Sequence, residues 1–351
     1  MKRLAAALFT TAMALGPPAA ASDGVEPREY RYADVHLHYV DFFQETAGMD
    51  EMFEAMDAAG VDHVVLMGIP VAKKWDENEP QRPRYYQGDD APLYWYSATD
   101  VIVAEAVKAL PEARRERVHP FLAGFNPNDK NADAHIERML DLYPGLFKGI
   151  GEVFTRHDDL TAMVLGDAPR ANSEAMMRVY RLAARHGLPV VLHANLTSVR
   201  ERQPLYREEI DEALDANPDT TIIWAHAGTS AAINRFQGEL GFLLEAVSGL
   251  MQTHANLYID LSWSVLEHML DEDGRLDDGW RELVLAHPTR FMLGSDLVGR
   301  FGSLGEKFEQ YRPLLDALPE AVAHDLARGN LMRLLAAAGD DDGDAGAGKP
   351  D

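Results

Sequence analysis

The chain contains no cysteine among its 351 residues. This absence excludes disulfides, thiolate metal ligands, a cysteine nucleophile and a lipid-modified cysteine anchor. Any metal ion bound by the protein must therefore be held by histidine, aspartate, glutamate or a modified lysine.

Positive charge is scarce, and so are long apolar runs. There are 33 lysine and arginine residues against 57 aspartate and glutamate residues, which gives a formal net charge of -24. Such an excess of negative charge argues against nucleic acid or an anionic membrane as a partner. The apolar stretch at residues 4–15 is too short to span a bilayer, and no later segment is long and apolar enough to do so.

Both ends of the chain differ from the rest. Lys2 and Arg3, the apolar residues 4–15 and the small residues 19–21 form the pattern of a secretory signal peptide over residues 1–21. A buried N-terminal helix is the alternative. We expect a secreted mature protein, periplasmic if the source is a Gram-negative bacterium. Residues 339–351 are acidic and glycine-rich, which predicts a disordered tail and leaves 22–338 as one catalytic domain.

Short apolar runs alternate with amphipathic helical patterns along the whole domain. Such alternation predicts an α/β fold with a parallel sheet, and eight units predict a (β/α)8 TIM barrel. A doubly wound open sheet is the alternative. One polar and aromatic segment, residues 71–96, interrupts the rhythm as a long loop, and its aromatic content favours an ordered one. The predicted strands are residues 32–40, 63–67, 118–125, 147–153, 189–193, 221–226, 257–261 and 290–294, and the clearest helices are 49–59, 132–143, 173–186 and 206–216.

The first predicted strand carries His36 and His38, two residues apart and therefore on one face. Paired neutral imidazoles suit zinc and similar metals, although an isolated pair is more often an ordinary core or surface feature. Four later strands end in residues that can bind a metal. Because the carboxyl ends of barrel strands meet at one mouth, these residues are expected to converge. They are Glu152, His193, His226 and Asp296.

These residues and their local motifs resemble the amidohydrolase superfamily. The similarity is to its amidohydrolase-related (family 2) branch, which includes aminocarboxymuconate-semialdehyde decarboxylase. It extends from about residue 34 to residue 335. The motifs are the two histidines of the first strand, Val-Val-Leu-His-Ala at 190–194, Trp-Ala-His-Ala-Gly at 224–228, Leu-Gly-Ser-Asp at 293–296 and Gly-Asn-Leu-Met-Arg-Leu at 329–334.

The resemblance implies a catalytic divalent metal, zinc first, with manganese or iron as alternatives. It implies that His36, His38 and Asp296 bind the ion, with His193 as a further ligand. Such an ion lowers the pKa of bound water towards about 7 and polarises a carbonyl group. Asp296 would then act as the general base, and His226 would contact the attacking water or the substrate.

The resemblance leaves one or two ions open. Binuclear relatives bridge their metals with a group on the fourth strand, either a carboxylated lysine or a glutamate. Lys148 and Glu152 both occur there, and Glu152 lies at the carboxyl end, where the other ligands converge. We therefore favour Glu152, and a second ion would take His193 and His226 as ligands.

Substrate contacts are predicted only by position. Lys73, Lys74 and Trp75 begin the long loop, Arg156 follows the fourth strand, and Arg300 follows the eighth. Each could hold a carboxylate or a flat ring, and for each a solvated or packing role is an equal alternative.

The sequence thus predicts an exported metal-dependent hydrolase that cleaves an amide, a lactone or another ester of a small molecule, with carboxylated substrates among the candidates. One alternative is a metal-dependent decarboxylase of the same superfamily, since relatives of this branch decarboxylate. Another is a metal-binding protein without turnover. The base Asp296 speaks against it, because binding alone needs no base. A homo-oligomer is compatible with the sequence.

Overall fold

The computed structural model describes residues 28–75, 92–157 and 160–340. The predicted signal peptide, most of the long loop and residues 341–351 of the predicted tail lie outside the described residues. The last helix, α13 (Asn330–Asp340), extends two residues into the predicted tail. Within the described ranges, no helix is both long and apolar enough to cross a membrane.

The centre of the molecule is a parallel sheet with the strand order β10-β9-β8-β7-β6-β5-β2-β1-β11. Every pairing in it is parallel, as the alternating sequence pattern predicts. The strands are β1 (Tyr32–His38), β2 (Val61–Met67), β5 (Val118–Leu122), β6 (Gly149–Phe154), β7 (Val190–His193), β8 (Ile222–Trp224), β9 (Leu257–Asp260), β10 (Phe291–Met292) and β11 (Leu297–Val298).

The eighth strand position is split in two, and this split closes the barrel. Segment β10 pairs with β9, whereas β11 pairs with β1 at the other end of the sheet order. Between them, the amide of Val35 donates to the carbonyl of Leu293, and the amide of Asp296 donates to the carbonyl of His36. The nine labelled segments therefore fill eight strand positions of a (β/α)8 barrel, and this fold prediction is confirmed.

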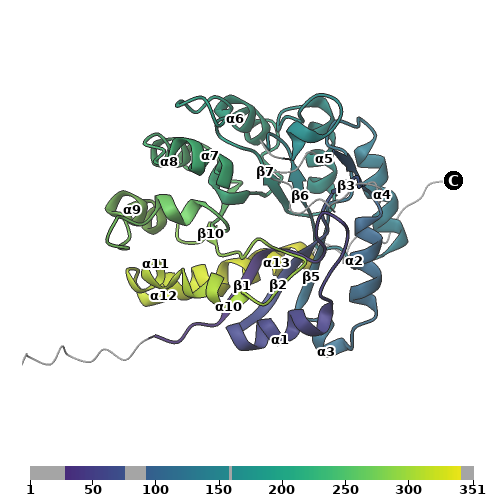
Figure 1. Ribbon diagram of the computed structural model, residues 1–351, viewed down its shortest axis with the longest axis horizontal. Helices are drawn as coiled ribbons and strands as arrows, with labels where there is room; N and C mark the ends of the chain where they lie inside the picture. Colours follow the sequence, from purple (N-terminus) through teal and green to yellow (C-terminus); the bar gives the residue numbers. More distant parts are fainter. Residues whose placement is uncertain (1–27, 76–91, 158–159, 341–351) are drawn as a thin grey trace, which may run out of the picture.

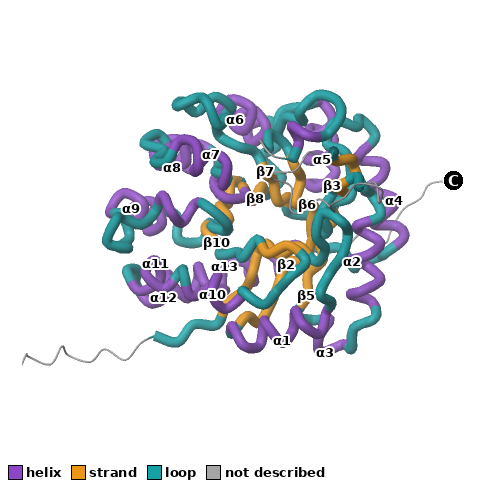
Figure 2. Tube along the Cα trace, in the orientation of Figure 1, coloured by secondary structure: helices purple, strands orange, loops and turns teal. Residues whose placement is uncertain are grey.

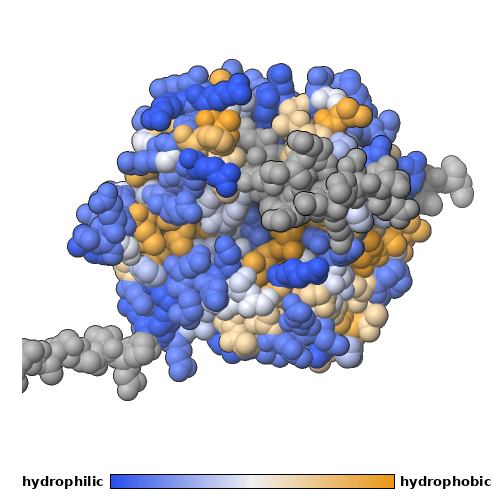
Figure 3. Space-filling view, viewed as in Figure 1, coloured by the Kyte–Doolittle hydropathy of each residue, from blue (hydrophilic) through white to orange (hydrophobic). Residues whose placement is uncertain are grey.

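Helices form the outer layer around the strands (Figures 1 and 2). The predicted helices at 49–59, 132–143, 173–186 and 206–216 correspond to α1, α4, α5 and α6, with ends that differ by at most one residue. Hydrophilic side chains cover the face where α10, α11 and α12 lie (Figure 3), in keeping with the acidic composition. The helices are α1 (Met49–Ala59), α2 (Thr99–Lys108), α3 (Glu112–Arg115), α4 (Ala132–Leu142), α5 (Glu174–Arg185), α6 (Arg207–Asp215), α7 (Ala231–Gln237), α8 (Leu243–Thr253), α9 (Asp278–Ala286), α10 (Leu304–Glu309), α11 (Arg312–Asp316), α12 (Glu320–His324) and α13.

Part of the long loop is ordered as an antiparallel hairpin. Strand β3 (Val71–Lys73) pairs with β4 (Leu93–Trp95), and Leu93 also bridges Val164 on the loop after β6. The hairpin follows β2 at its carboxyl end, which is the end of the barrel where the predicted site residues lie.

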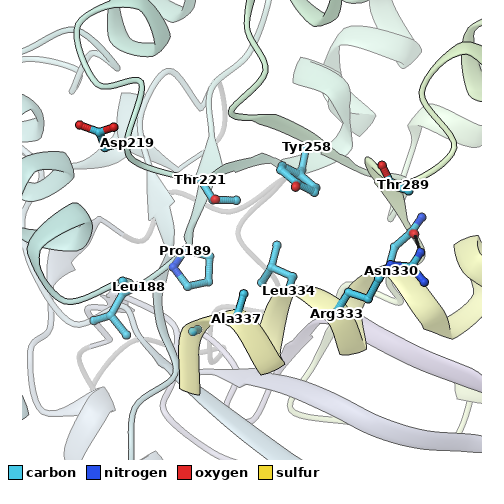
Figure 4. Close-up of a pocket in the computed structure, with 12 residues that line it drawn as sticks. Leu188, Pro189, Asp219, Thr221, Tyr258, Thr289, Asn330, Arg333, Leu334 and Ala337 are labelled. Carbon is cyan, nitrogen blue, oxygen red and sulfur yellow. Dashed lines mark hydrogen bonds between the residues drawn. The ribbon is translucent and has the colours of Figure 1, made fainter. Parts of the chain in front are cut away.

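A second, smaller apolar cluster fills the barrel interior, and α13 closes the amino-terminal end of the strands. Leu331 and Leu335 of α13 belong to this interior cluster. Figure 4 shows the same end, where Leu334 and Ala337 of α13 lie across a pocket from residues at the starts of β7, β8 and β9. Helix α13 thus covers the end of the barrel that lies opposite the predicted site residues.

Candidate metal centre

Six side chains converge at the carboxyl mouth of the barrel, each from the carboxyl-terminal part of a strand or from the segment that follows one. A local irregularity in β1 aims the first two. Ala33 and Val35 pack inside the barrel, whereas Leu37 packs outside it. The set of residues that points inward therefore changes from odd-numbered to even-numbered positions where the pairing of β1 with β2 is irregular. This shift places His36 and His38 at the mouth. The others are Glu152 on β6, His193 on β7, His226 after β8 and Asp296 before β11.

Four of these residues bring one donor atom each within 4.8 Å of the others. Nε2 of His36 and Nε2 of His38 lie 3.1 Å apart, and each lies 3.2 Å from Oε2 of Glu152. Oδ1 of Asp296 lies 3.5 Å from both imidazole nitrogens. Ligand atoms bound at about 2.0–2.1 Å to a tetrahedral zinc lie roughly 3.3 Å from one another, so the spacing fits a divalent ion.

The ring protons of both histidines point away from this cluster. Nδ1 of His36 lies 2.7 Å from a carboxylate oxygen of Asp260, and Nδ1 of His38 lies 2.9 Å from the carbonyl oxygen of Gly68. Both partners can only accept, so each Nδ1 carries the proton. Each neutral ring then turns the lone pair of Nε2 toward the other and toward Glu152. Lone pairs and carboxylates that face one another at these distances could hold a divalent cation, and imidazole and carboxylate are donors that zinc accepts.

A second group shares the other oxygen of Glu152. Oε1 lies 3.0 Å from Nδ1 of His193 and 3.5 Å from Nε2 of His226. Nε2 of His193 lies 3.0 Å from Oδ1 of Asn195 and donates to it, which leaves Nδ1 of His193 as the nitrogen that faces Glu152. Glu152 thus belongs to two groups of possible ligands, one with His36, His38 and Asp296 and the other with His193 and His226. Oδ2 of Asp296 lies 3.8 Å from Nε2 of His226.

The electrostatics of the site favour positive charge among the carboxylates. Burial alone would lower the pKa of His36, but Glu152, Asp296 and Asp260 outweigh it and hold that pKa well above its ordinary value. Burial would likewise raise the pKa of Glu152, but the adjacent His36 and the hydrogen-bonding imidazoles hold it well below its usual range. A divalent ion would supply the positive charge that protonated imidazoles would otherwise give to these carboxylates, because imidazoles that bind a metal must be neutral.

Left-handed backbone conformations gather at the mouth. Five residues other than glycine have positive φ among the described residues, and four of them belong to the site or its immediate loops. They are His226 (φ 56°), Ala227 (φ 48°), Trp263 (φ 54°) and Asp296 (φ 50°). Such conformations cost free energy and persist where the surroundings fix them, often at functional sites.

The mouth opens into a pocket lined by six apolar side chains and six polar or charged ones. The ring of Trp263 lies 5.1 Å from the ring of His226, edge to face, and the ring of His157 stacks on His193 at 4.1 Å. Burial first, and then the neighbouring histidine, hold the pKa of His157 well below its ordinary value. The described lining consists of His38, Phe42, Ile69, Glu152, Phe154, His157, Leu160, His193, His226, Trp263, Asp296 and Val298.

None of the five predicted substrate residues is in this described lining. Arg156 is committed elsewhere: its guanidinium donates to both carboxylate oxygens of Glu209 and lies 4.3 Å from the Tyr206 ring. That pairing gives Arg156 a carboxylate partner within the protein, and its substrate role stays a prediction.

The other four lie on the loops around the mouth. Lys73 is buried in β3, Lys74 is exposed, and Trp75 is 41% exposed. Arg300 is exposed, and its guanidinium donates to the neighbouring carbonyl of Gly299.

Sequence reasoning missed Asp260 and Ser262. Asp260 ends β9 and accepts from His36, and Ser262 lies 2.8 Å from Nδ1 of His226. The rule that strand ends carry the chemistry would have found Asp260, had it been applied to the run 257–261. Asp34 was also missed. It is fully buried, and burial raises its pKa to about 7, against hydrogen bonds from Ser295 and the amide of His36.

Comparison with known proteins places this arrangement in a family. The amidohydrolase family model matches residues 33–336, so the chain belongs to the amidohydrolase family, a family of enzymes. No curated protein matches the sequence.

Solved structures share the fold at low sequence identity. One is 5-carboxyvanillate decarboxylase from Sphingomonas paucimobilis, with a TM-score of 0.52, 16% identity, and coverage of 88% of this chain and 99% of that one. An amidohydrolase from Burkholderia multivorans with bound zinc has a TM-score of 0.55 and 13% identity, covering 87% and 99%. A probable 2-pyrone-4,6-dicarboxylic acid hydrolase from Acinetobacter baumannii has a TM-score of 0.54 and 11% identity, also covering 87% and 99%.

Proposed function

We propose that the protein is a metal-dependent hydrolase that cleaves an amide, a lactone or another ester of a small molecule. His36, His38, Glu152 and Asp296 would hold the ion, with zinc as the first candidate because its usual ligands are imidazole and carboxylate. When bound, such an ion supplies a lowered pKa for water and polarisation of a carbonyl group.

Asp296 and His226 would carry out the proton transfers of the reaction. Asp296 is the least buried of the four candidate ligands, with 13% of its side chain exposed, and it lines the pocket. One of its oxygens faces the imidazole pair, while the other faces Nε2 of His226. Asp296 is therefore placed to take a proton from water and return it to a leaving group. His226 would accept a hydrogen bond at Nε2 and orient the reacting group.

The pocket wall would exclude water and position the substrate. Phe42, Phe154 and Trp263 contribute aromatic surface beside the candidate ligands. Aromatic and aliphatic walls with a few converging polar groups are typical of small-molecule sites.

The observation that favours hydrolysis is the charge of this lining. Among its described members, there is no lysine or arginine, while Glu152 and Asp296 both contribute carboxylates. A neutral ester, lactone or amide fits such a pocket better than a carboxylated substrate, which would have to rely on the metal for its positive partner.

Decarboxylation is the second candidate, because 5-carboxyvanillate decarboxylase shares the fold and the chain belongs to the same broad family. The same proton-handling residues would serve there, with Asp296 or His226 giving a proton to carbon. Export of the mature protein remains our expectation from residues 1–21 and is independent of this choice.

The position of Glu152 supports a second ion as an extension of the proposal. Its two oxygens face separate groups, so a second ion between Glu152, His193 and His226 would make Glu152 a bridge. The protein would then bind two metal ions instead of one.

The test begins with metal content. Purified protein is expected to contain close to stoichiometric zinc, manganese or iron. It should then be assayed on neutral lactones, esters and amides and on aromatic carboxylates, with CO₂ release measured separately from hydrolytic product. Hydrolysis without CO₂ supports the proposal. CO₂ release establishes the second candidate, and bound metal without turnover on any class leaves a metal-binding protein.

A further inference from the structure

A buried carboxylate at the end of β9 connects two histidines of the site. Oδ2 of Asp260 accepts from Nδ1 of His36 at 2.7 Å and from the hydroxyl of Ser262 at 2.7 Å. The same hydroxyl oxygen lies 2.8 Å from Nδ1 of His226. Asp260, Ser262 and both imidazoles are at most 1% exposed, so water does not compete for these contacts.

The direction of these hydrogen bonds follows from what each atom can do. A carboxylate accepts, so the single hydroxyl proton of Ser262 is donated to Asp260. The oxygen of Ser262 can then only accept from Nδ1 of His226, which must carry a proton. With Nδ1 protonated, neutral His226 turns the lone pair of Nε2 toward Glu152 and Asp296.

We propose that Asp260 and Ser262 are positioning residues that form a relay, in which one carboxylate fixes the ring protons of both His36 and His226. The relay keeps Nε2 of both rings available as an acceptor or a ligand. This inference deepens the proposed function and rests on it, since the value of an open Nε2 lies in binding the ion or the reacting group.

The hydroxyl is the required link to His226. Nδ1 of His226 lies 4.0 Å from Oδ2 of Asp260, which is too far for a direct hydrogen bond. Nδ1 of His36 reaches Asp260 directly at 2.7 Å, and its contact with the hydroxyl oxygen of Ser262 is longer, at 3.4 Å. The ring of His36 stacks on that of His226 with centroids 5.1 Å apart. Removing the hydroxyl should therefore affect one histidine and spare the other.

The backbone anchors the carboxylate itself. Oδ1 of Asp260 accepts from the amide of Ser262 at 2.8 Å, while Oδ2 serves His36 and the hydroxyl. An asparagine at position 260 cannot reproduce this pattern in either orientation. Its NH₂ group would face the amide of Ser262, or it would face the ring N–H of His36.

The decisive experiment reads the ring protons by ¹⁵N NMR of histidine-labelled full-length protein. In the unmodified protein, His226 is expected as the Nδ1–H tautomer, both with zinc bound and metal-free at mildly alkaline pH. In Ser262→Ala, Nδ1 loses its acceptor while Nε2 still faces two carboxylates, so more than half of His226 should convert to Nε2–H. His36 should keep its proton on Nδ1.

Ser264→Ala is the matched control, because Ser264 is a buried hydroxyl on the same loop that contacts Thr229 instead of an imidazole. It is expected to leave the His226 tautomer unchanged. If Ser262→Ala retains the Nδ1–H form of His226, or if Ser264→Ala converts it equally, the relay is refuted.

Zinc competition with a chromophoric chelator provides a second readout. Loss of a hydrogen-bond partner behind a metal-binding histidine typically weakens metal affinity by about 10–100-fold, and we expect that loss in Asp260→Asn. Unchanged affinity in a folded Asp260→Asn protein would contradict the role at His36. If this variant does not fold, the tautomer measurement on Ser262→Ala still decides. Failure of the unmodified protein to bind zinc refutes the proposed function, whereas the metal-free spectra still test the relay.

Discussion

Replacing Asp296 with asparagine tests the proposed proton acceptor with little structural disturbance. Asp296 has φ of 50°, a left-handed conformation in which asparagine and aspartate are the most common residues after glycine. The amide has nearly the same shape, so the barrel should fold normally. The change removes a charge whose Oδ1 lies 3.5 Å from Nε2 of both His36 and His38.

The expected effect on turnover is large. General acid–base catalysis contributes typically about 10²–10⁴-fold, which corresponds to roughly 2.7–5.4 kcal/mol of activation free energy. Loss of one of four candidate metal ligands should weaken zinc binding in addition. We therefore expect kcat/KM to fall by at least about 10²-fold even when the variant is assayed with saturating zinc.

The assay measures kcat/KM on the best substrate of the panel, together with zinc content by mass spectrometry. Asp62→Asn is the control, because Asp62 lies at the opposite end of the barrel, where it pairs with Arg31 and Arg328. The control is expected to retain full activity. A loss of less than about tenfold in Asp296→Asn with zinc retained would refute the base assignment and transfer it to His226.

Four further outcomes are expected. The double variant His36→Ala, His38→Ala should lose its metal, as mass spectrometry would show, and retained metal with retained rate would contradict the centre. Gly294→Ala should destabilise the fold by about 1–3 kcal/mol in a denaturant titration, because its added Cβ would lie 2.8 Å from Cβ of His36; an unchanged midpoint would refute this packing. When the metal-free protein is titrated with zinc, activity should rise between one and two equivalents if Glu152 bridges two ions, and Glu152→Gln should abolish that rise. Full activity at one equivalent that is unchanged in Glu152→Gln excludes the bridge. Burial raises the pKa of Asp100 from its ordinary 3.8 to about 7, so the contribution of this carboxyl to the free energy of unfolding is largest at low pH and is lost as pH rises from about 4 to 7. In that range the free energy of unfolding should fall by up to about 1.4 kcal/mol per pH unit relative to that of Asp100→Asn. Parallel plots of unfolding free energy against pH for the two proteins would contradict the shift.

The sequence predicts the barrel well because its strands are buried on both faces and read as short apolar runs. The eight predicted strands all occur, with ends that differ by up to three residues. The break of the eighth strand was not predicted. Residues 290–294 read as one strand, whereas β10 ends at Met292, β11 begins at Leu297, and Asp296 between them adopts a left-handed conformation.

The site was predictable only as a set of residue types at strand ends. That rule placed Glu152 beside His36 and His38, but it could not show that His193 faces the other oxygen of Glu152. The pairing of Arg156 with Glu209, 53 residues away, depends on how α6 packs near the loop after β6. Local sequence patterns do not show contacts between residues so far apart in the chain. The pairing with Glu209 could therefore not be compared with the predicted substrate role of Arg156.

The charge balance inside the barrel connects the fold to the proposed chemistry. Strand ends bring Glu152, Asp260 and Asp296 together where little water remains, and isolated buried carboxylates are costly. Arginine or lysine could neutralise them, but the basic side chains that the described structure places there are histidines. Their Nδ1 protons are already committed to Asp260, directly for His36 and through Ser262 for His226. What the rings offer to the centre is therefore lone pairs. A cluster of carboxylates and imidazole lone pairs is stable when a metal cation occupies its middle, so the same contacts that hold this mouth of the barrel together also prepare it for an ion.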